Sequence, residues 1–274
     1  MKNTLLFLLI NGFVICGICQ VEAPEKKPLT IGEQITLHSQ ILDQDRLLNI
    51  YLPASYHPDS LNRYPVIYLL DGSIHEDFLH IVGLVQFGSY PWINMLPESI
   101  VVGISNIDRK HDFTFPTTIE EDKKDFPTTG GSAAFIECLG KEIQPLIEKT
   151  YPADGTSTLI GQSLGGLVAT EILLKHPDLF NRYMIVSPSL WWDNESLLKF
   201  PLPEQLQTKE IYIAVGKEGE VMENDTRALH SLLGTAKNAP SRLYFSYFPE
   251  HDHGDILHQA IYQGFQTLFQ STTK

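Results

Sequence analysis

The hydrophobic positions of this chain fall into short, nearly continuous runs separated by longer stretches of mixed character. The runs span residues 66–70, 100–104, 158–160, 183–186, 211–215 and 243–248. A short apolar run without alternation is typical of a strand buried on both faces, as in a parallel sheet covered by helices. We therefore interpret these segments as strands of a mostly parallel central sheet.

The stretches between these runs predict helices. We expect helices over residues 132–148, 164–176, 226–233 and about 255–270, and Pro177 ends the second of them. Two earlier segments, residues 34–42 and 46–52, indicate an opening antiparallel pair joined at residues 43–45. The alternation of strands and helices predicts an α/β fold with about eight strands and helices on both faces.

Length and charge narrow the possible partners. A chain of 274 residues with 43% hydrophobic content can bury one large core, and no internal repeat divides it. We therefore expect one domain over residues 20–274. Lys and Arg number 20 against 33 Asp and Glu, without a basic stripe, which argues against nucleic acid and anionic membrane surfaces as partners.

Residues 1–19 predict a signal peptide. Lys2 supplies a positive start, residues 4–16 form an apolar core too short to span a bilayer, and residues 17–19 offer small side chains for cleavage. We expect an exported protein, periplasmic or secreted, with no integral membrane span once this segment is removed.

The cysteines fit the same interpretation. Cys16 and Cys19 lie in the predicted signal peptide, and neither follows a small-residue lipobox, which disfavours a lipoprotein anchor. Only Cys138 is left in the mature chain, so we expect no intrachain disulfide.

One predicted strand leads into a serine flanked by glycines. The segment from Gly161 to Gly165 reads Gly-Gln-Ser-Leu-Gly and lies between a strand and a helix, the context that a nucleophile elbow requires. The turn would expose Ser163 Oγ at the head of the helix, where the Leu164 N–H faces a developing oxyanion. A structural turn with a capping serine is the alternative, but the context favours a catalytic serine in an α/β-hydrolase fold.

The base should follow the last strand, since the chain order in this fold is serine, acid, histidine. The segment "YFPEHDHGDILHQAI" offers His251, His253 and His258. His258 falls inside the closing helix, whereas His253 precedes Gly254 in the loop. We predict His253 as the base, with His251 as the alternative.

The acid should lie in the loop "KEGEVMEND", which follows the strand at residues 211–215. Its four carboxylates belong to Glu218, Glu220, Glu223 and Asp225, and such a run could equally be a solvated loop. Glu218 and Glu220 are nearest to the strand end. We predict Glu218 as the acid and keep Glu220 as the alternative.

A second oxyanion donor should come from the loop after the strand at residues 66–70. The N–H of Gly72 or of Ser73 could approach the substrate, although a plain Asp-Gly turn is the simpler interpretation. The polar residues that follow match no usual zinc spacing, so we expect neither a metal nor a cofactor. These residues are His75, Glu76, Asp77 and His80.

Six motifs follow one another along the chain: "SQILDQDRLLNIYLPASY", "YPVIYLLDG", "IVVGISNIDRKHDFT", "LIGQSLGGL", "SPSLWWD" and "FPEHDHGDILHQAIYQGF". Together they resemble the putative esterase (esterase D) family, in its branch of enterochelin-esterase-like α/β hydrolases. The resemblance runs from about residue 31 to residue 269. It implies Ser163 as the nucleophile and His253 as the base. Counting back from Met222, the family spacing favours Glu218 as the acid, although the loop is one residue short and Glu220 stays open.

Other positions of the family motifs carry open interpretations. Members commonly have histidine where this chain has Gln162, a difference that we expect to leave the chemistry unchanged. Arg109 and Asp112 match a motif and could brace the loop beside the site or form a structural ion pair. Trp191 and Trp192 follow a strand, so they could line the substrate pocket or pack in the core.

Together these features predict an exported serine esterase that hydrolyses small-molecule carboxylic esters through an acyl-enzyme intermediate. The resemblance implies siderophore trilactones, aryl esters such as feruloylated sugars, or short acyl esters. The acidic chain provides no evident steering for anionic ferric siderophores. The alternatives are an acyltransferase with the same triad and a non-catalytic binding protein on a hydrolase scaffold. The sequence carries no signal for an oligomeric state.

Overall fold

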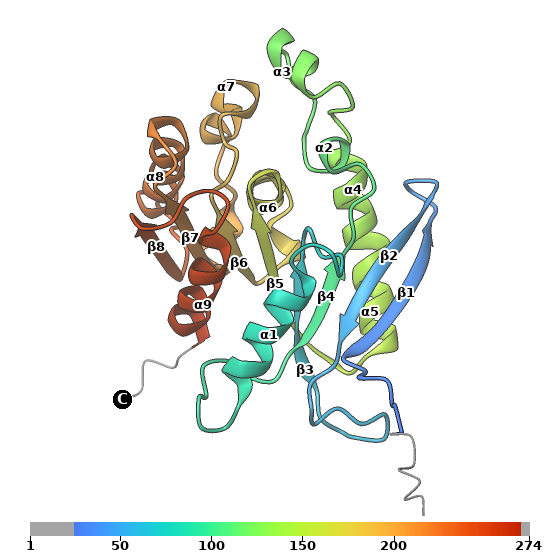
Figure 1. Ribbon diagram of the computed structural model, residues 1–274. Helices are drawn as coiled ribbons and strands as arrows, with labels where there is room; N and C mark the ends of the chain where they lie inside the picture. Colours follow the sequence, from blue (N-terminus) through green and yellow to red (C-terminus); the bar gives the residue numbers. More distant parts are fainter. Residues whose placement is uncertain (1–24, 270–274) are drawn as a thin grey trace, which may run out of the picture. The chain divides into compact units, whose positions relative to one another are not determined.

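The computed structural model describes residues 25–269, so the predicted signal peptide lies outside the described part of the chain. The chain divides into two units, and residues 25–30, the described part of the first, contain no helix or strand. From Ile31 onward, the described residues form one compact unit built on an eight-stranded sheet. Helices flank this sheet on both faces (Figure 1). The predicted α/β fold is confirmed.

The sheet is antiparallel at one edge and parallel elsewhere. The strands β1 and β2 form a hairpin, β2 pairs antiparallel with β4, and all other pairings are parallel. Their order across the sheet is β1-β2-β4-β3-β5-β6-β7-β8. The bounds are β1 Gly32–Ser39, β2 Gln44–Tyr51, β3 Tyr64–Leu69, β4 Ile100–Ile104, β5 Ala153–Gln162, β6 Arg182–Val186, β7 Glu210–Gly216 and β8 Arg242–Phe248.

Each face of the sheet has its own hydrophobic layer. On one face, α1 (Phe78–Ser89) and α9 (Ile256–Phe269) pack against the strands. On the other face lie α4 (Ser132–Cys138), α5 (Gln144–Thr150), α6 (Leu164–Lys175) and α8 (Glu220–Gly234). The shorter helices are α2 (Arg109–Asp112), α3 (Glu120–Asp125), α7 (Trp192–Glu195), and the 3₁₀ segments Pro177–Leu179, Ser196–Lys199 and Glu204–Thr208.

The longer helices depart from the sequence prediction in three places. The helix α1 was not predicted, because its apolar residues are so dense that the helical period is hard to see. The helix predicted over residues 132–148 is divided by a π-helical segment, Leu139–Ile143. The helix α8 begins at Glu220 rather than at residue 226, because Gly219 and the Glu223 carboxylate provide an earlier start.

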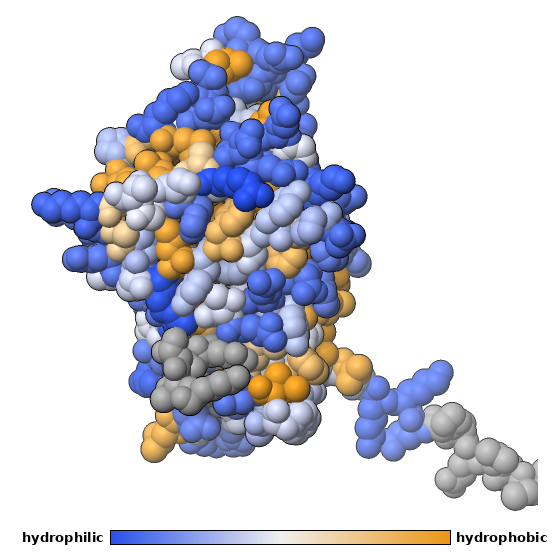
Figure 2. Space-filling view, turned by 90° about the vertical axis from the view of Figure 1, so that its left-hand side faces the viewer, coloured by the Kyte–Doolittle hydropathy of each residue, from blue (hydrophilic) through white to orange (hydrophobic). Residues whose placement is uncertain are grey.

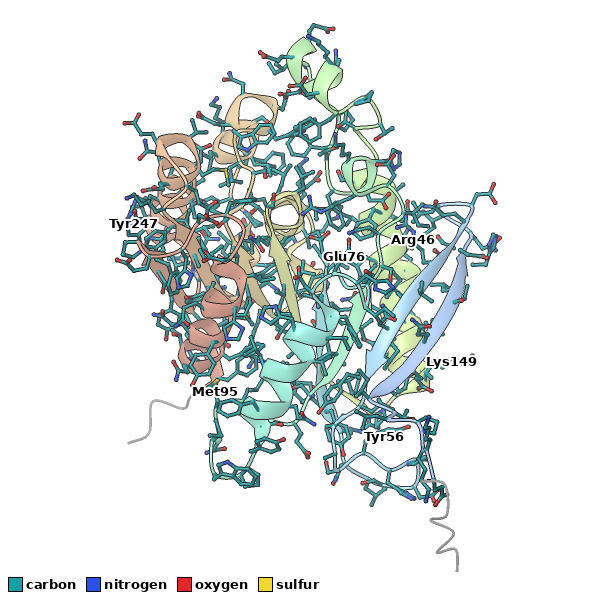
Figure 3. All side chains as sticks on the ribbon, viewed as in Figure 1. Arg46, Tyr56, Glu76, Met95, Lys149 and Tyr247 are labelled. Atoms are coloured by element: carbon teal, nitrogen blue, oxygen red, sulfur yellow. The ribbon has the colours of Figure 1, made fainter. Side chains whose placement is uncertain are left out.

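A buried ion pair fastens α2 to the sheet. Arg46 on β2 and Asp112 at the end of α2 have side chains only 1% exposed, with Nη1 and Oδ2 2.7 Å apart. Arg46 lies between β2 and α4, where its guanidinium sits 5.7 Å from the Phe135 ring centre (Figure 3). Within residues 25–269, Arg46 Nε and Nη2 have no hydrogen-bond partner. Asp112 is therefore essential for compensating the buried charge.

The outer surface is polar over most of the face shown in Figure 2, where hydrophobic side chains gather in small groups between hydrophilic ones. This agrees with the excess of Asp and Glu in the sequence. Among residues 25–269, no helix has the length and apolar character needed to cross a membrane.

Replacing Asp112 with Asn should destabilise the protein strongly. The change keeps the shape but leaves the Arg46 charge buried without a counter-charge, so we expect the free energy of unfolding to fall by about 3 kcal/mol or more. Glu137→Gln, which breaks the exposed pair with Lys141, should cost less than about 1 kcal/mol. Urea unfolding of both variants measures the difference, and equal losses would contradict the role assigned to the buried pair.

Candidate active site

A strained turn between β5 and α6 presents Ser163. Its φ of 60° and ψ of −121° place it in a region that non-glycine residues rarely adopt. The turn is tight because a Cβ at Gly161 would lie 2.3 Å from the Gly165 carbonyl oxygen, so only glycine fits there. The Ser163 N–H donates to the Val186 carbonyl at 3.1 Å, which fixes the turn against β6. This is the geometry expected of a nucleophile elbow.

The structure brings His253 and Glu218 together at the same edge of the sheet. His253 Nδ1 lies 2.5 Å from Glu218 Oε2, and the Glu218 side chain is 1% exposed against 45% for His253. Ser163 and His253 line one pocket. Glu220, the alternative acid, is the exposed first residue of α8, so the hydrogen bond to His253 is formed by Glu218.

The Glu218 carboxylate is held in its ionised form. Burial raises its pKa, but hydrogen bonds from His253, from Ser187 Oγ at 2.5 Å and from the Gly216 N–H at 2.9 Å outweigh burial, so the net pKa is lowered. An ionised carboxylate on Nδ1 leaves His253 Nε2 free to accept a proton.

The loop that carries Glu218 is shaped by a second carboxylate. Glu223 Oε1 accepts the N–H of Glu218 at 3.1 Å and the N–H of Gly219 at 3.2 Å. Glu223 was one of the four carboxylates of this loop, and the sequence predicted no role for it. Its position at the start of α8 makes it a capping residue of this helix.

The other two histidines of the segment have different contacts. The His251 carbonyl accepts the Lys217 N–H at 2.7 Å and thereby joins the loops after β7 and β8. His251 Nδ1 lies 3.3 Å from Asp255 Oδ1. His258 lies on α9, and its Nδ1 is 2.8 Å from His80 Nε2 on α1. Neither histidine contacts the Glu218 carboxylate through these groups.

Figure 3 shows Glu76 near the carboxyl ends of the central strands. Glu76 lines the same pocket as Ser163 and His253, which has a volume of about 430 Å³. Its lining residues are Asp71, Glu76, Asp77, Arg109, Gln162, Ser163 and His253. Arg109 Nε and Nη2 donate to the two carboxylate oxygens of Asp71 at 2.6 and 2.9 Å. The Arg109 Nη2 also donates to the Gln162 carbonyl at 3.2 Å. Arg109 therefore braces the elbow itself.

Arg109 and Asp112 do not pair with each other. Each forms an ion pair with a different strand or strand end, Arg109 with Asp71 after β3 and Asp112 with Arg46 on β2. The helix α2 is thus fastened at both ends, which holds the loop beside the pocket in place.

The candidate oxyanion donors are not equivalent. Leu164 is the first residue of α6, so its N–H has no acceptor within the helix and lies at the positive end of the helix dipole. The Gly72 N–H donates to the Ile104 carbonyl at 2.9 Å and is therefore not available, which corrects its proposed role. The Ser73 N–H donates to Glu76 Oε2 at 3.2 Å. Ser73 is left as the second candidate, since a side-chain partner can move aside.

The two tryptophans are separated as adjacent side chains at a strand end should be. Trp192 is fully buried, and its Nε1 donates to the Phe115 carbonyl at 3.0 Å, so its assignment to the substrate pocket is wrong. Trp191 is partly buried, with its ring centre 5.9 Å from that of Phe126. Neither tryptophan lines the pocket that holds Ser163.

Sequence reasoning underestimated Gln162. Its Nε2 donates to the His253 carbonyl at 2.7 Å, so the residue before the serine holds the loop that carries the histidine. The only signal in the sequence was the departure from the family's usual histidine at this position.

Within residues 25–269, no group of three or more His, Cys, Asp or Glu side chains could hold a metal ion.

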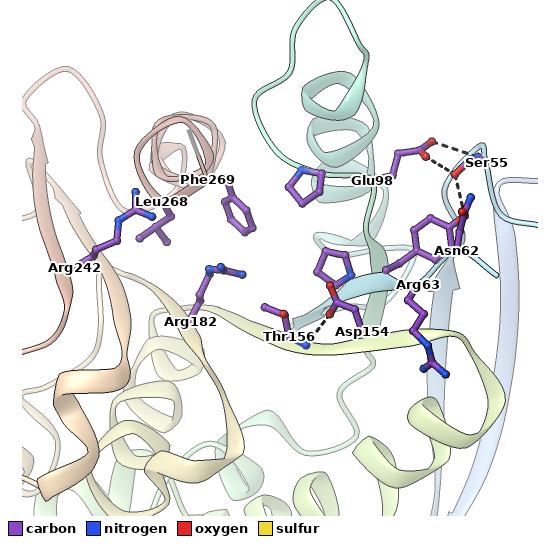
Figure 4. A pocket seen from close by; sticks show the side chains of 13 residues that line it. Ser55, Asn62, Arg63, Glu98, Asp154, Thr156, Arg182, Arg242, Leu268 and Phe269 are labelled. Atoms are coloured by element: carbon purple, nitrogen blue, oxygen red, sulfur yellow. Dashed lines mark hydrogen bonds between the residues drawn. The ribbon is translucent and has the colours of Figure 1, made fainter. Parts of the chain in front are cut away.

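A larger hollow of about 560 Å³ lies at the other end of the strands, where they begin (Figure 4). Its lining includes Tyr64, Arg182 and Arg242, which begin β3, β6 and β8. Arg182 Nε is 2.6 Å from Glu210 Oε2, so its charge is already compensated. Because Ser163, His253 and Glu218, the predicted nucleophile, base and acid, all lie at the carboxyl ends of the strands, the smaller pocket is the candidate site.

Comparison with known proteins leads to one family. Residues 39–267 match the family model described as Putative esterase. The chain is 27% identical over 238 residues to the ferri-bacillibactin esterase BesA of Bacillus subtilis, covering 78% of this chain and 82% of that protein.

Solved structures agree with this match. An IroE-like serine hydrolase from Shewanella oneidensis superposes with a TM-score of 0.77 and 30% identity, covering 87% of this chain and 80% of that one. The BES protein from Bacillus cereus gives a TM-score of 0.76 and 26% identity, covering 91% and 99% of the two chains. The protein therefore has the α/β-hydrolase fold and acts on carboxylic ester bonds, and it belongs to the Putative esterase family, in its enterochelin-esterase-like branch.

Proposed function

We propose that this protein is a serine esterase that cleaves small-molecule esters with Ser163 as nucleophile, His253 as base and Glu218 as the acid. The observation that carries the proposal is the short hydrogen bond between the buried Glu218 carboxylate and His253, a residue that lines one pocket together with Ser163. No cofactor is needed for this chemistry, because the attacking group, the base and the oxyanion donors all come from the chain.

In the proposed reaction, His253 Nε2 removes the proton from Ser163 Oγ as this oxygen attacks the ester carbonyl carbon. The N–H groups of Leu164 and Ser73 would stabilise the oxyanion. The tetrahedral intermediate collapses as His253 gives its proton to the departing alcohol, which leaves an acyl group on Ser163. Water, deprotonated by the same histidine, then attacks the acyl carbon. The C–Oγ bond breaks, His253 returns the proton to Ser163 Oγ, and the carboxylic acid leaves.

Substrate and location extend the proposal. A relative named as a ferri-bacillibactin esterase supports siderophore-type esters as one substrate class. Aryl esters are a second class, which the resemblance of the sequence motifs implies. Export to the periplasm or the cell exterior is supported by the sequence of residues 1–19.

Replacing Ser163 with Ala should abolish the esterase reaction. Without the hydroxyl no acyl-enzyme can form, so we expect kcat for p-nitrophenyl esters to fall by at least about three orders of magnitude. Ser231→Ala, at an exposed position of α8, serves as the control and should keep wild-type turnover. Release of p-nitrophenol by the purified variants measures kcat, and equal turnover by Ser163→Ala would refute the nucleophile assignment.

The two candidate acids can be separated by a matched pair of variants. Glu218→Gln removes the charge that orients His253 and stabilises its protonated form, so we expect kcat to fall about 10³-fold. Glu220→Gln, two positions along the chain, changes an exposed carboxylate and should have little effect. The comparison is made with one p-nitrophenyl ester under identical conditions. A large loss in Glu220→Gln, with Glu218→Gln active, would reverse the assignment.

A further inference from the structure

The pocket around Ser163 carries an excess of negative charge. Three carboxylates and one guanidinium line it. The guanidinium belongs to Arg109, whose Nε and Nη2 donate hydrogen bonds to Asp71. That bidentate pair is neutral as a unit. Glu76 accepts only neutral donors, the Ser73 N–H at 3.2 Å and the Asn106 side-chain amide at 3.0 Å. Glu76 and Asp77 form no ion pair within residues 25–269. Two carboxylates beside Ser163 thus form no ion pair of their own among these residues, and the positive charge that acts on them is that of Arg109, which is already paired with Asp71.

The pKa of Asp77 also reflects the negative charge of the pocket. It precedes α1, and its side chain makes no capping hydrogen bond to this helix. Burial, with the neighbouring carboxylates of Asp71 and Glu76, raises its pKa to about 6, against the opposing effect of Arg109. A carboxyl group whose charge is opposed by its neighbours marks a negative potential at this place in the pocket. Near neutral pH it is still ionised.

We propose that this pocket selects esters that carry a positive charge close to the scissile bond, with Glu76 and Asp77 as the residues that determine the preference. An ammonium group in the pocket would supply a counter-charge, whereas an anionic substrate would be repelled, so this preference disfavours the anionic ferric siderophores among the substrate classes proposed above. The net charge of −13 acts in the same direction at longer range. Because this selectivity rests on the proposed esterase function, its test must distinguish the failure of one from the failure of the other.

Arg109 is the one feature that could favour the opposite preference. Its side chain is 34% exposed and borders the pocket, so an anionic substrate could in principle approach it. However, its contacts to Asp71 and to the Gln162 carbonyl occupy the guanidinium and tie it to the elbow. An anion would have to compete with a bidentate carboxylate that is already in place.

The test compares cationic esters with their neutral isosteres and with an anionic ester. On the acyl side these are the p-nitrophenyl esters of γ-trimethylammoniobutyric acid, of its neutral tert-butyl isostere and of glutaric acid. On the alcohol side they are choline butyrate and its neutral tert-butyl isostere. In at least one series we expect kcat/KM for the cationic ester to exceed that for the neutral isostere by about 10-fold, and the glutaric ester to be the poorest substrate. The preference should shrink in about 0.5 M NaCl.

The variants Glu76→Gln and Asp77→Asn show whether these two carboxylates are the cause. Each should reduce the ratio of kcat/KM between the cationic and neutral esters, and the double variant should bring it close to one. A ratio within one variant is insensitive to losses of folded protein. Glu204→Gln, an exposed carboxylate in the 3₁₀ segment Glu204–Thr208, is the matched control and should keep the wild-type ratio.

The pH dependence of the ratio gives a second readout. Asp77 is protonated and neutral below its raised pKa of about 6 and charged above it. The preference for the cationic ester should therefore rise between about pH 5 and about pH 7, and this rise should be lost in Asp77→Asn.

The outcomes separate the two proposals. If wild type hydrolyses the neutral esters but prefers the cationic ester over its neutral isostere in neither series, or hydrolyses the anionic ester equally well or better, or keeps its cationic preference in the double variant, the charge selectivity is wrong and the esterase stands. If it hydrolyses none of the esters, the proposed function fails and the selectivity fails with it.

Discussion

The contact between Gly161 and Gly165 sets the geometry on which the site depends. Because no side chain fits between them, β5 and α6 meet in a turn that forces Ser163 to a positive φ. The backbone groups of Ser163 are paired despite this strain. Its N–H donates to Val186, and its carbonyl accepts the N–H of Leu167 at 2.9 Å and that of Ser189 at 3.1 Å. These bonds hold a conformation that the residue alone would not adopt.

A non-glycine residue with a positive φ also follows the strands on either side of β5. Asp71, after β3, has a φ of 55°, and Ser187, after β6, has a φ of 44°. Each carries a side chain that supports the site, since Asp71 binds Arg109 and Ser187 Oγ donates to Glu218. Three adjacent strands thus end in non-glycine residues with positive φ at one edge. Such strain is retained where the surrounding bonds determine the conformation, and here it aims side chains at one pocket.

What the sequence could predict followed from local pattern and chain order. Apolar runs marked the strands, and the placement of loops after strands led to Ser163, His253 and Glu218, which the structure brings to one edge. What it could not predict depends on contacts between distant segments. The Gly72 amide is used by Ile104 because β3 lies beside β4. The burial of Trp192 and the partners of Arg109 and Asp112 likewise follow from packing that no local motif encodes.

Reaction chemistry and substrate choice come from different parts of this molecule. The elbow and the Glu218–His253 pair are built from β5, β7, β8 and the turns that follow them, a geometry that belongs to the fold. Glu76 and Asp77 lie in the segment between β3 and α1, and Glu76 is bound there only by neutral donors. Their charges can therefore change without breaking an ion pair of the catalytic edge. A relative can share the elbow and still prefer esters of another charge, because fold and chemistry do not fix the ligand.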